Sequence, residues 1–451
     1  MRALSAIVAP AAGLVFCLLP LATGCSPRLA NGNAVSASKG ESPSAPAPAQ
    51  VPDSAWTTQM PVIGGVVKCA NGKAKLYSCQ NAELLSYLPV SMIGGGKLSG
   101  VWGWTDTATK REFAIVGRST GTAFVEITDP VNPKYLGNLA VHEGANPAIW
   151  HDMKVYKSHA FIVSDAAGLH GMQVFDLTQL RDVKNAPVEF HETAHYDNVA
   201  SVHTIIMNEA TGFAYNAGSN GGGETCGGGL HMVDVHNPTE PKFAGCYAEP
   251  RTGNAGTGYV HDALCVVYHG PDKQYQGREI CLNSAETAVS IADVTDKQNP
   301  KTISIASYPN VGYTHQGWFT EDQRYFFLDD ETDDGAGGDN RTRTIVFDLN
   351  DLDDPLVLTE FRGTTNATDH NLYIRGQYMY QSNYTAGLRI VDVSDPKAPK
   401  EVGYFDVFPR GADEAGYAGT WSNYPYFSKD GLVAVTSIGE GLFLVQSRVG
   451  K

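Results

Sequence analysis

The chain has 451 residues, of which 42% are hydrophobic and 18% are charged, so it can bury a large core and is not expected to be disordered. Its 48 acidic residues outnumber 33 basic ones, giving a formal net charge of −15. No Lys and Arg cluster reverses this charge locally, which argues against nucleic acid and anionic membrane surfaces as partners and favours cations. The 48 Gly, 24 Pro, 21 Tyr and 17 Phe predict an all-β fold of many short strands joined by turns.

The N-terminus has the features of an export signal. A weakly basic start leads into an apolar run that ends at the sequence ATGC, whose cysteine is Cys25. This pattern predicts a lipoprotein signal peptide over residues 1–24 and lipidation of Cys25 after cleavage. Ser26 directly after the cysteine is typical of an outer-membrane address, so we expect an exported lipoprotein of the outer membrane or cell surface. An ordinary signal peptide cut elsewhere, or a membrane-spanning anchor, are the alternatives.

The remaining chain divides into three parts. Residues 25–54 are mostly Ala, Pro, Ser, Gly and Asn, which predicts a flexible tether. Residues 55–97 form an N-terminal segment, and residues 98–451 carry the repeats described below. Beyond the tether, no run of eighteen apolar residues occurs.

Six cysteines remain once Cys17 in the signal and Cys25 are set aside. An even number in an exported chain predicts disulfides, although six cysteines allow fifteen pairings. A cysteine metal site is the alternative, but the chain lacks the CxxC spacing typical of such sites. Proximity in sequence favours the pairs Cys69 with Cys79, Cys226 with Cys246, and Cys265 with Cys281.

Internal repetition is the most informative feature of the sequence. A strand-like pattern, exemplified by LRIVDV, occurs seven times, at 122–127, 172–177, 230–235, 289–294, 344–349, 388–393 and 442–447. Several copies continue into a turn with Pro and then into an outer strand, as at 134–137. Upstream in each unit, a Trp or His is expected to open a short apolar strand, at spacings of 47 to 58 residues: Trp104, His151, His203, His261, His315, His370 and Trp421.

Four strands per unit at this period are the signature of a β-propeller, in which each small sheet packs against its neighbours. We therefore predict a seven-bladed β-propeller of four-stranded antiparallel blades. The seventh unit ends directly after its third strand, and the strand-like stretch 82–89 can complete it and close the ring without an exposed edge. A six-bladed ring with an extra hairpin, or a two-domain sandwich, are the alternatives.

The repeat GLRIVDVS at 387–394 resembles the LVIVD repeat. Nearly the whole mature chain, about residues 66–447, is similar to the choice-of-anchor B family of bacterial exported proteins. This resemblance implies a surface-attached domain, here in the lipoprotein variant, and it implies no established reaction. The matching stretches are LLSYLP (84–89), VWGWTD (101–106), VGRS (116–119), GMQVFDL (171–177), GREIC (277–281), YTHQG (313–317) and WSNYP (421–425).

The repeated histidines are the first candidate site. Because the first strand of each blade lines the central channel, the five histidines are expected to converge on the axis. With Asp106, Asp152, Asp262 and Asp369 beside the landmark positions, they offer nitrogen and oxygen donors for Zn²⁺, Cu²⁺ or another divalent ion. The alternative is structural, with each histidine hydrogen-bonded to the next blade. The candidate ligands are His151, His203, His261, His315 and His370.

An acidic run at 329–334 is the second candidate. Carboxylates packed beside a Gly-rich loop are what Ca²⁺ coordination needs. The spacing departs from that of the helix-loop-helix calcium motif, so a solvated acidic turn is the alternative. The calcium candidates are Asp329, Asp330, Glu331, Asp333 and Asp334.

No catalytic signature accompanies these sites. The chain has no GxSxG nucleophile elbow, no HExxH, and no Lys-Ser/Thr after its Gly-rich stretch at 218–223. We therefore expect a monomeric binding or scaffolding module for an envelope protein, glycan or small ligand, attached to the membrane through its lipid. A metal-dependent hydrolase or oxidoreductase is the alternative, because propeller hydrolases and lactonases use a central metal. That analogy selects His151, His261, His315, His370, Asn371 and Glu331. Separately, core packing is expected for Trp102, Trp104, Trp318 and Trp421, and the alternative is that they line the same mouth and bind sugar or peptide.

Overall fold

The computed structural model describes residues 60–334 and 338–450. The predicted signal peptide, Cys25 and the tether lie outside these residues. Short antiparallel strands dominate, together with the 3₁₀ helices η2 (Val90–Ile93), η3 (Leu177–Asp182) and η4 (Cys226–Gly228). No helix in the described part of the chain has the length and apolar character needed to cross a bilayer.

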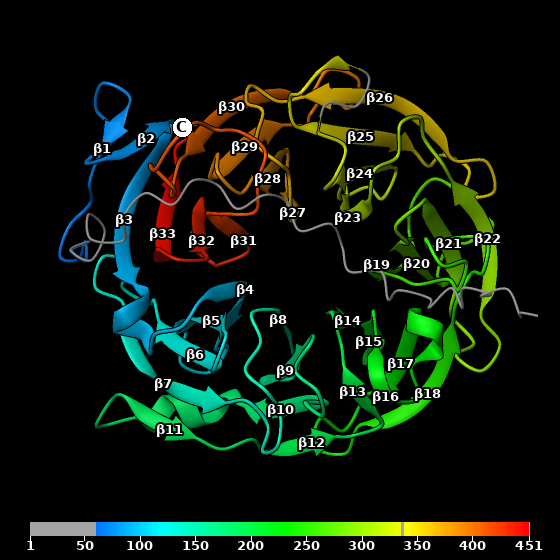
Figure 1. Cartoon of the computed structure of the whole chain (residues 1–451), viewed down its shortest axis with the longest axis horizontal. Coiled ribbons are helices and arrows are strands. Elements are labelled where there is room, and N and C mark those ends of the chain that lie inside the picture. The colour runs from blue at the N-terminus through cyan, green and yellow to red at the C-terminus, as the bar shows by residue number, and fades with distance from the viewer. Residues whose placement is uncertain (1–59, 335–337, 451) are drawn as a thin grey trace, which may run out of the picture. The chain divides into compact units, whose positions relative to one another are not determined.

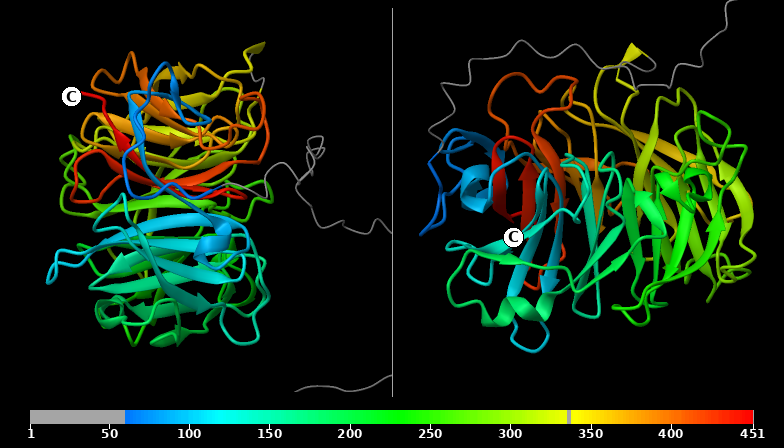
Figure 2. Two further views of the ribbon diagram at one scale, coloured as in Figure 1. Left: turned by 90° about the vertical axis from the view of Figure 1, so that its left-hand side faces the viewer. Right: turned by 60° about the horizontal axis from the view of Figure 1, so that its bottom comes forward.

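Seven sheets surround a central axis and confirm the predicted propeller (Figure 1). Side views show these sheets as a series of twisted blades (Figure 2). The alternatives of six blades or a sandwich are thereby excluded. From the inner to the outer strand, the blades are β4 (Leu98–Thr105), β5 (Glu112–Arg118), β6 (Gly121–Glu126) and β7 (Lys134–Ala140); β8 (His151–Tyr156), β9 (His159–Ser164), β10 (Met172–Asp176) and β12 (Ala194–Tyr196); β14 (Thr204–Asn208), β15 (Phe213–Ala217), β17 (Leu230–Asp234) and β18 (Lys242–Tyr247); β19 (Asp262–Val267), β20 (Glu279–Ser284), β21 (Val289–Asp293) and β22 (Lys301–Ala306); β23 (Thr314–Phe319), β24 (Tyr325–Asp330), β25 (Arg343–Asp348) and β26 (Leu356–Arg362); β27 (Leu372–Arg375), β28 (Tyr378–Ser382), β29 (Leu388–Asp392) and β30 (Lys400–Phe405); and β31 (Thr420–Tyr424), β32 (Leu432–Ser437), β33 (Gly441–Ser447) and β3 (Ala82–Pro89).

The repeated pattern seen in the sequence is the third strand of every blade. In five blades, the pairing between this strand and the outer strand is interrupted at the same place, for example between Ile390 and Val391. Such an irregularity increases the local twist, which helps each blade wrap over its neighbour. Strand β18 requires a glycine at position 245, because a Cβ there would collide with the carbonyl oxygen of Lys297 in the next blade.

Strand β3 closes the ring as the sequence predicts. It pairs antiparallel with β33, and Leu84 lies opposite Val445 while Tyr87 lies opposite Phe443. The Tyr87 and Phe443 rings stack with centroids 4.4 Å apart. The first and last strands of the propeller therefore share one blade, which leaves no open edge at the junction.

The N-terminal segment extends this closure to neighbouring blades. Strand β2 (Tyr77–Gln80) pairs with β30 and, with β1 (Lys73–Ala74), widens the sixth blade. Residue Val67 exchanges two backbone hydrogen bonds with Leu84 of β3. The disulfide Cys69–Cys79 ties the segment to itself, and the other two disulfides, Cys226–Cys246 and Cys265–Cys281, also follow the expected pairing.

Further strands lie outside the regular blades. Strand β11 (Val188–Phe190) pairs in parallel with β7 and gives the first blade a fifth strand. Strands β13 (Val199–Ser201) and β16 (Asn220–Gly223) form a separate pair beside the third blade. From β11 on the first blade, the chain returns to β12 of the second blade. This path brings together loops of the two blades that are far apart in the sequence.

The prediction for Trp104 is wrong. Strand β4 is eight residues long and is irregular between Leu98 and Val101, so its axial position falls on Gly100 and Trp104 lies near its end. The Trp104 ring stacks on Phe113 at 5.0 Å within the core between the first and second blades. It therefore stabilises packing and does not reach the axis.

Candidate metal site on the propeller axis

The five predicted histidines line one cavity on the axis, where the inner strands begin. Gly100 and Trp421 occupy the corresponding places in the first and seventh blades. The cavity measures about 30 Å³. Because one water needs roughly 10–15 Å³ of such space, the cavity has room for an ion with a bound water, not for a large ligand.

Four of the five imidazoles form a continuous arc. Their ring centroids lie 4.3 Å apart from His203 to His261, 4.2 Å from His261 to His315, and 4.6 Å from His315 to His370. His151 lies apart from this arc; its Nε2 is 3.3 Å from Ser164 Oγ. The structure therefore brings four of the predicted ligands together and places the fifth elsewhere on the cavity wall.

Two histidines of the arc are fixed by backbone carbonyl groups. His261 Nδ1 donates to the carbonyl oxygen of His315 at 3.1 Å, and His370 Nδ1 donates to that of Trp421. A carbonyl oxygen can only accept, so both rings carry their proton on Nδ1. The lone pair of each neutral ring is therefore on Nε2, as in histidines that bind metals.

The other two histidines of the arc face carboxyl groups. His203 Nδ1 donates to Asp165 Oδ2 at 3.0 Å, and His315 Nδ1 lies 3.3 Å from both Asp329 oxygens. The Nε2 atom of His315 is thus directed away from Asp329 and towards Glu331. Carboxylate partners of this kind orient metal-binding imidazoles and increase their basicity.

Glu331 completes a set of three ligand atoms. Its Oε2 lies 4.0 Å from His315 Nε2 and its Oε1 lies 3.9 Å from His370 Nε2. One ligand atom of each residue lies within 4.8 Å of the other two. Two imidazoles and a carboxylate are a donor set suited to Zn²⁺ and other divalent transition metals.

Burial favours the neutral forms of two of the three candidate ligands, His315 and Glu331. Burial raises the pKa of Glu331 to about 7, although the Tyr384 hydroxyl donates to its Oε1 at 2.6 Å and opposes the shift. Burial, followed by the charge of neighbouring histidines, holds the pKa of His315 well below its ordinary value. For His203, burial opposes the charged form, but Asp165 outweighs it and the pKa rises. A divalent ion would offset the cost of the buried carboxylate.

A second cavity of about 40 Å³, which shares Lys154, Asp262 and Tyr373 with the first, combines one ion pair with aromatic rings. Lys154 Nζ lies 2.8 Å from Asp152 Oδ2 and 4.6 Å from the centre of the Trp102 ring. The Trp102 and Tyr373 centroids are 5.9 Å apart, and those of Tyr373 and Trp318 are 5.1 Å apart. Two of the four predicted tryptophans, Trp102 and Trp318, thus line this second cavity, and Trp421 lines the first with the histidines.

The acidic residues at 329–334 contact several different groups of the protein. Asp329 and Asp330 point to opposite faces at the end of β24, and Asp330 and Asp333 share Arg343. Only Glu331 shares a group of three potential metal ligands within the described residues. The remaining members contact protein donors. Asp329 accepts from the Gln316 backbone at 2.6 Å, Asp330 from the Tyr308 hydroxyl at 2.9 Å and the Gly312 backbone at 2.8 Å, Asp333 from Arg343, and Asp334 from the Thr368 hydroxyl at 2.7 Å.

The acidic residues beside the landmark positions also separate. Asp152 and Asp262 reach the cavity, as does Asn371. Asp106 lies outside the cavity lining and pairs with Arg181 at 2.7 Å.

Sequence reasoning missed Asp165 and Tyr384. Asp165 directly follows β9, as Glu331 directly follows β24, and Tyr384 lies two residues after β28. Their shared place just after the second strand of a blade is the signal that can identify them.

Two segments match the LVIVD repeat model, residues 225–249 and 369–407. They span strands of the third and sixth blades. No curated protein matches the chain. The LVIVD repeat expected from the sequence is therefore present.

Solved structures share the fold at low sequence identity. The β-propeller domain of Cps50 (Swd1) from Myceliophteria thermophila is 12% identical, with a TM-score of 0.51, covering 80% of this chain and 99% of that one. A protein from Lactobacillus plantarum is 12% identical, with a TM-score of 0.50, covering 75% and 88% respectively. A chain of the COPII outer coat vertex on membranes is also 12% identical, with a TM-score of 0.50, covering 78% and 84%. Together, the fold and the repeat matches identify the chain as a seven-bladed β-propeller that contains LVIVD repeats.

Proposed function

We propose that this protein is a cell-envelope lipoprotein of the choice-of-anchor B type, whose propeller is a binding or scaffolding module with a divalent transition metal at its axis. One observation carries the metal assignment: His315, His370 and Glu331 place three ligand atoms within 4.8 Å of one another. The His370 ring also has its Nδ1 atom engaged by a carbonyl group, which leaves Nε2 free to bind. Zn²⁺ and Cu²⁺ suit these donors best.

Export and anchoring rest on separate support. The ATGC sequence at Cys25 follows the lipoprotein rules, and three disulfides suit an oxidising compartment. The lipid holds the propeller at the membrane, so that the domain is presented to an envelope protein, a glycan or a small ligand. Two exposed aromatic side chains offer contact surface for it. Trp150 lines the axial cavity and is 39% exposed, and Tyr417 packs against Tyr384 and is 47% exposed.

The second candidate function is a metal-dependent hydrolase or oxidoreductase. The specific observation in its favour is that the three-ligand set stands beside a cavity with room for a bound water. Catalytic zinc sites have this composition, with three protein ligands and one open position, whereas structural zinc sites have four protein ligands. Tyr384 donates to Glu331 and can orient that carboxylate.

Metal content tests the axial assignment. The mature protein is purified without chelators or a His tag, and its metals are counted by elemental mass spectrometry. We expect the natural protein to hold a transition metal and the His315→Ala, His370→Ala variant to contain one equivalent less. The control is His159→Ala, because His159 bonds only the nearby Lys157 carbonyl. A natural protein that takes up no Zn²⁺ or Cu²⁺, or a control that loses as much metal, would overturn the assignment.

Fractionation and turnover assays test the other parts. Cys25→Ser is expected to move the protein from the membrane to the soluble fraction, and unchanged membrane association would exclude lipid anchoring through Cys25. The metal-loaded protein is then screened against esters, lactones and redox dyes. Turnover that disappears in His315→Ala, His370→Ala would replace the binding function by the catalytic one.

A further inference from the structure

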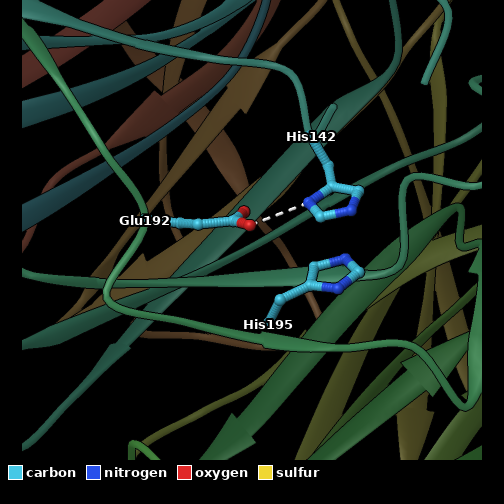
Figure 3. A group of neighbouring side chains, drawn as sticks. All are labelled: His142, Glu192 and His195. Carbon is cyan, nitrogen blue, oxygen red and sulfur yellow. Dashed lines mark hydrogen bonds and ion pairs between the residues drawn. The ribbon is translucent and has the colours of Figure 1, made fainter. Parts of the chain in front are cut away.

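A second group of metal-binding side chains lies away from the axial cavity, where the chain passes between the first and second blades. His142 lies between β7 and β8, Glu192 lies between β11 and β12, and His195 is part of β12. Figure 3 shows the carboxylate of Glu192 directed at the His142 ring, with the His195 ring beside it. One ligand atom of each residue lies within 4.8 Å of the other two. None of the three lines the axial cavity.

Each of two ligands is held by contacts outside the group. His195 Nε2 donates to the carbonyl oxygen of His170 at 2.8 Å, which leaves the lone pair of the neutral ring on Nδ1. The Oε2 atom of Glu192 accepts from Gln173 Nε2 at 2.9 Å, while its Oε1 lies 2.8 Å from His142 Nδ1. Gln173 is 2% exposed and therefore a fixed support. Such second contacts are what orient metal ligands in proteins.

The two imidazoles face each other closely. Their rings are 1° from parallel, with centroids 3.5 Å apart. Neutral imidazole is the form that binds a metal. The side chains of His142 and Glu192 are each 24% exposed, which gives an ion access from solvent.

We propose that His142, Glu192 and His195 form a second divalent metal site, independent of the axial one, which joins the first two blades. In a tetrahedral zinc site with bonds of about 2.0–2.2 Å, two ligand atoms lie about 3.4 Å apart. The three atoms of this group lie within 4.8 Å of one another, so each pair needs to shift by no more than about 1.4 Å to reach that spacing. The ion takes the place of the proton between His142 and Glu192, and a solvent molecule completes the shell.

Binding also requires a defined movement. A metal lies in the plane of each ring that binds it, so the two stacked rings must tilt away from parallel when the ion enters. The proton that His142 Nδ1 shares with Glu192 moves through solvent to Nε2 of the same ring, so that the bound imidazole stays neutral. Zn²⁺ uptake by this site is therefore expected to be accompanied by a change of the His142 and His195 ring resonances.

Zn²⁺ titration of the mature protein tests the second site. In a His315→Ala, His370→Ala background, which lacks the axial ligands, we expect one equivalent of Zn²⁺ to bind. Adding His142→Ala and His195→Ala should abolish this equivalent, whereas adding His191→Ala should retain it. His191 is exposed and precedes Glu192 directly, so it is a matched control on the same loop.

The titration distinguishes a failure of the second site from a failure of the axial site. If the His315→Ala, His370→Ala variant binds no Zn²⁺, or if adding His191→Ala removes as much Zn²⁺ as adding His142→Ala and His195→Ala, the second site is overturned and the axial one is not affected. If the axial substitutions prevent folding, His142→Ala with His195→Ala is made in the otherwise natural chain. Loss of one of two equivalents supports the second site there, and an unchanged count overturns it.

Discussion

Replacing Leu84 by Ala tests whether strand β3 holds the ring closed. Leu84 is fully buried and belongs to the core between the sixth and seventh blades. Its strand is fixed on both sides: β33 pairs with it on one edge, and Val67 exchanges backbone hydrogen bonds of 2.8 and 3.0 Å with Leu84 on the other. The backbone around the lost side chain therefore has little freedom to collapse.

The expected cost follows from this rigidity. Leu→Ala at buried sites lowers the free energy of unfolding by about 2–5 kcal/mol, with larger values where the cavity persists. We expect about 3–5 kcal/mol for Leu84→Ala, which is more than a hundredfold in the unfolding equilibrium constant. Leu76→Ala is the control, because Leu76 lies in the same N-terminal segment and is 46% exposed. Its cost is expected to stay within about 0.5 kcal/mol.

Urea titration followed by tryptophan fluorescence measures both variants against the natural protein. We expect a large fall in the urea midpoint of unfolding for Leu84→Ala and almost none for Leu76→Ala. Equal midpoints for the two variants would refute the role of β3 as the closing strand. A fall in midpoint with an unchanged slope would locate the effect in stability rather than in a change of the unfolded state.

Three further predictions concern pH, charge and disulfides. Burial lowers the pKa of His170 from about 6.5 to about 4, so its contribution to stability is complete above pH 6.5 and is lost as the pH falls towards 4. His170→Gln should therefore flatten the acid side of a urea-midpoint profile by up to about 3 kcal/mol, and an unchanged profile would contradict this. Arg343 is fully buried among three acidic side chains. Arg343→Met should lower the free energy of unfolding in urea by about 3–5 kcal/mol, because it leaves those carboxylates without a positive partner. An unchanged free energy of unfolding would show that the carboxylates become protonated instead. Replacing Cys226 and Cys246 together by Ala opens a bridge between positions 20 residues apart and should cost about 3 kcal/mol in thermal or urea unfolding, whereas a cost near zero would mean that the loop is ordered without it.

The blades could be predicted because their signals are local. Each unit repeats the same alternation, turn residues and spacing, and each blade packs mainly against its neighbours. The closing role of 82–89 followed from the same logic, since a seventh unit without an outer strand must obtain one elsewhere. The Trp104 prediction failed where the spacing varied: β4 starts earlier relative to its landmark than the other inner strands do, and only the pairing reveals this.

The candidate sites could be predicted only in part. The repeat placed the histidines on the axis, but it treats them as equivalent, and the structure separates His151 from the arc. Glu331 joins the axial histidines because of the direction that the chain takes after β24. Since most residues of the run are acidic, the sequence does not show which of them reaches the histidines. His142 and Glu192 lie in connections between strands, and His195 lies in β12, the outer strand of the second blade. They meet because β11 returns to pair with β7, a parallel contact that has no pattern of its own in the sequence.

The N-terminal segment also determines how the domain responds to mechanical load. A pull on the chain before residue 60 reaches the ring through residues 60–89, and the Cys69–Cys79 bridge carries that tension across its loop. The load then arrives at β3, whose hydrogen bonds to β33 must be sheared together if the pull runs along the strand. Resistance to force is set by the height of the unfolding barrier, not by equilibrium stability. The strand that completes the seventh blade is thus also the element through which the propeller bears tension.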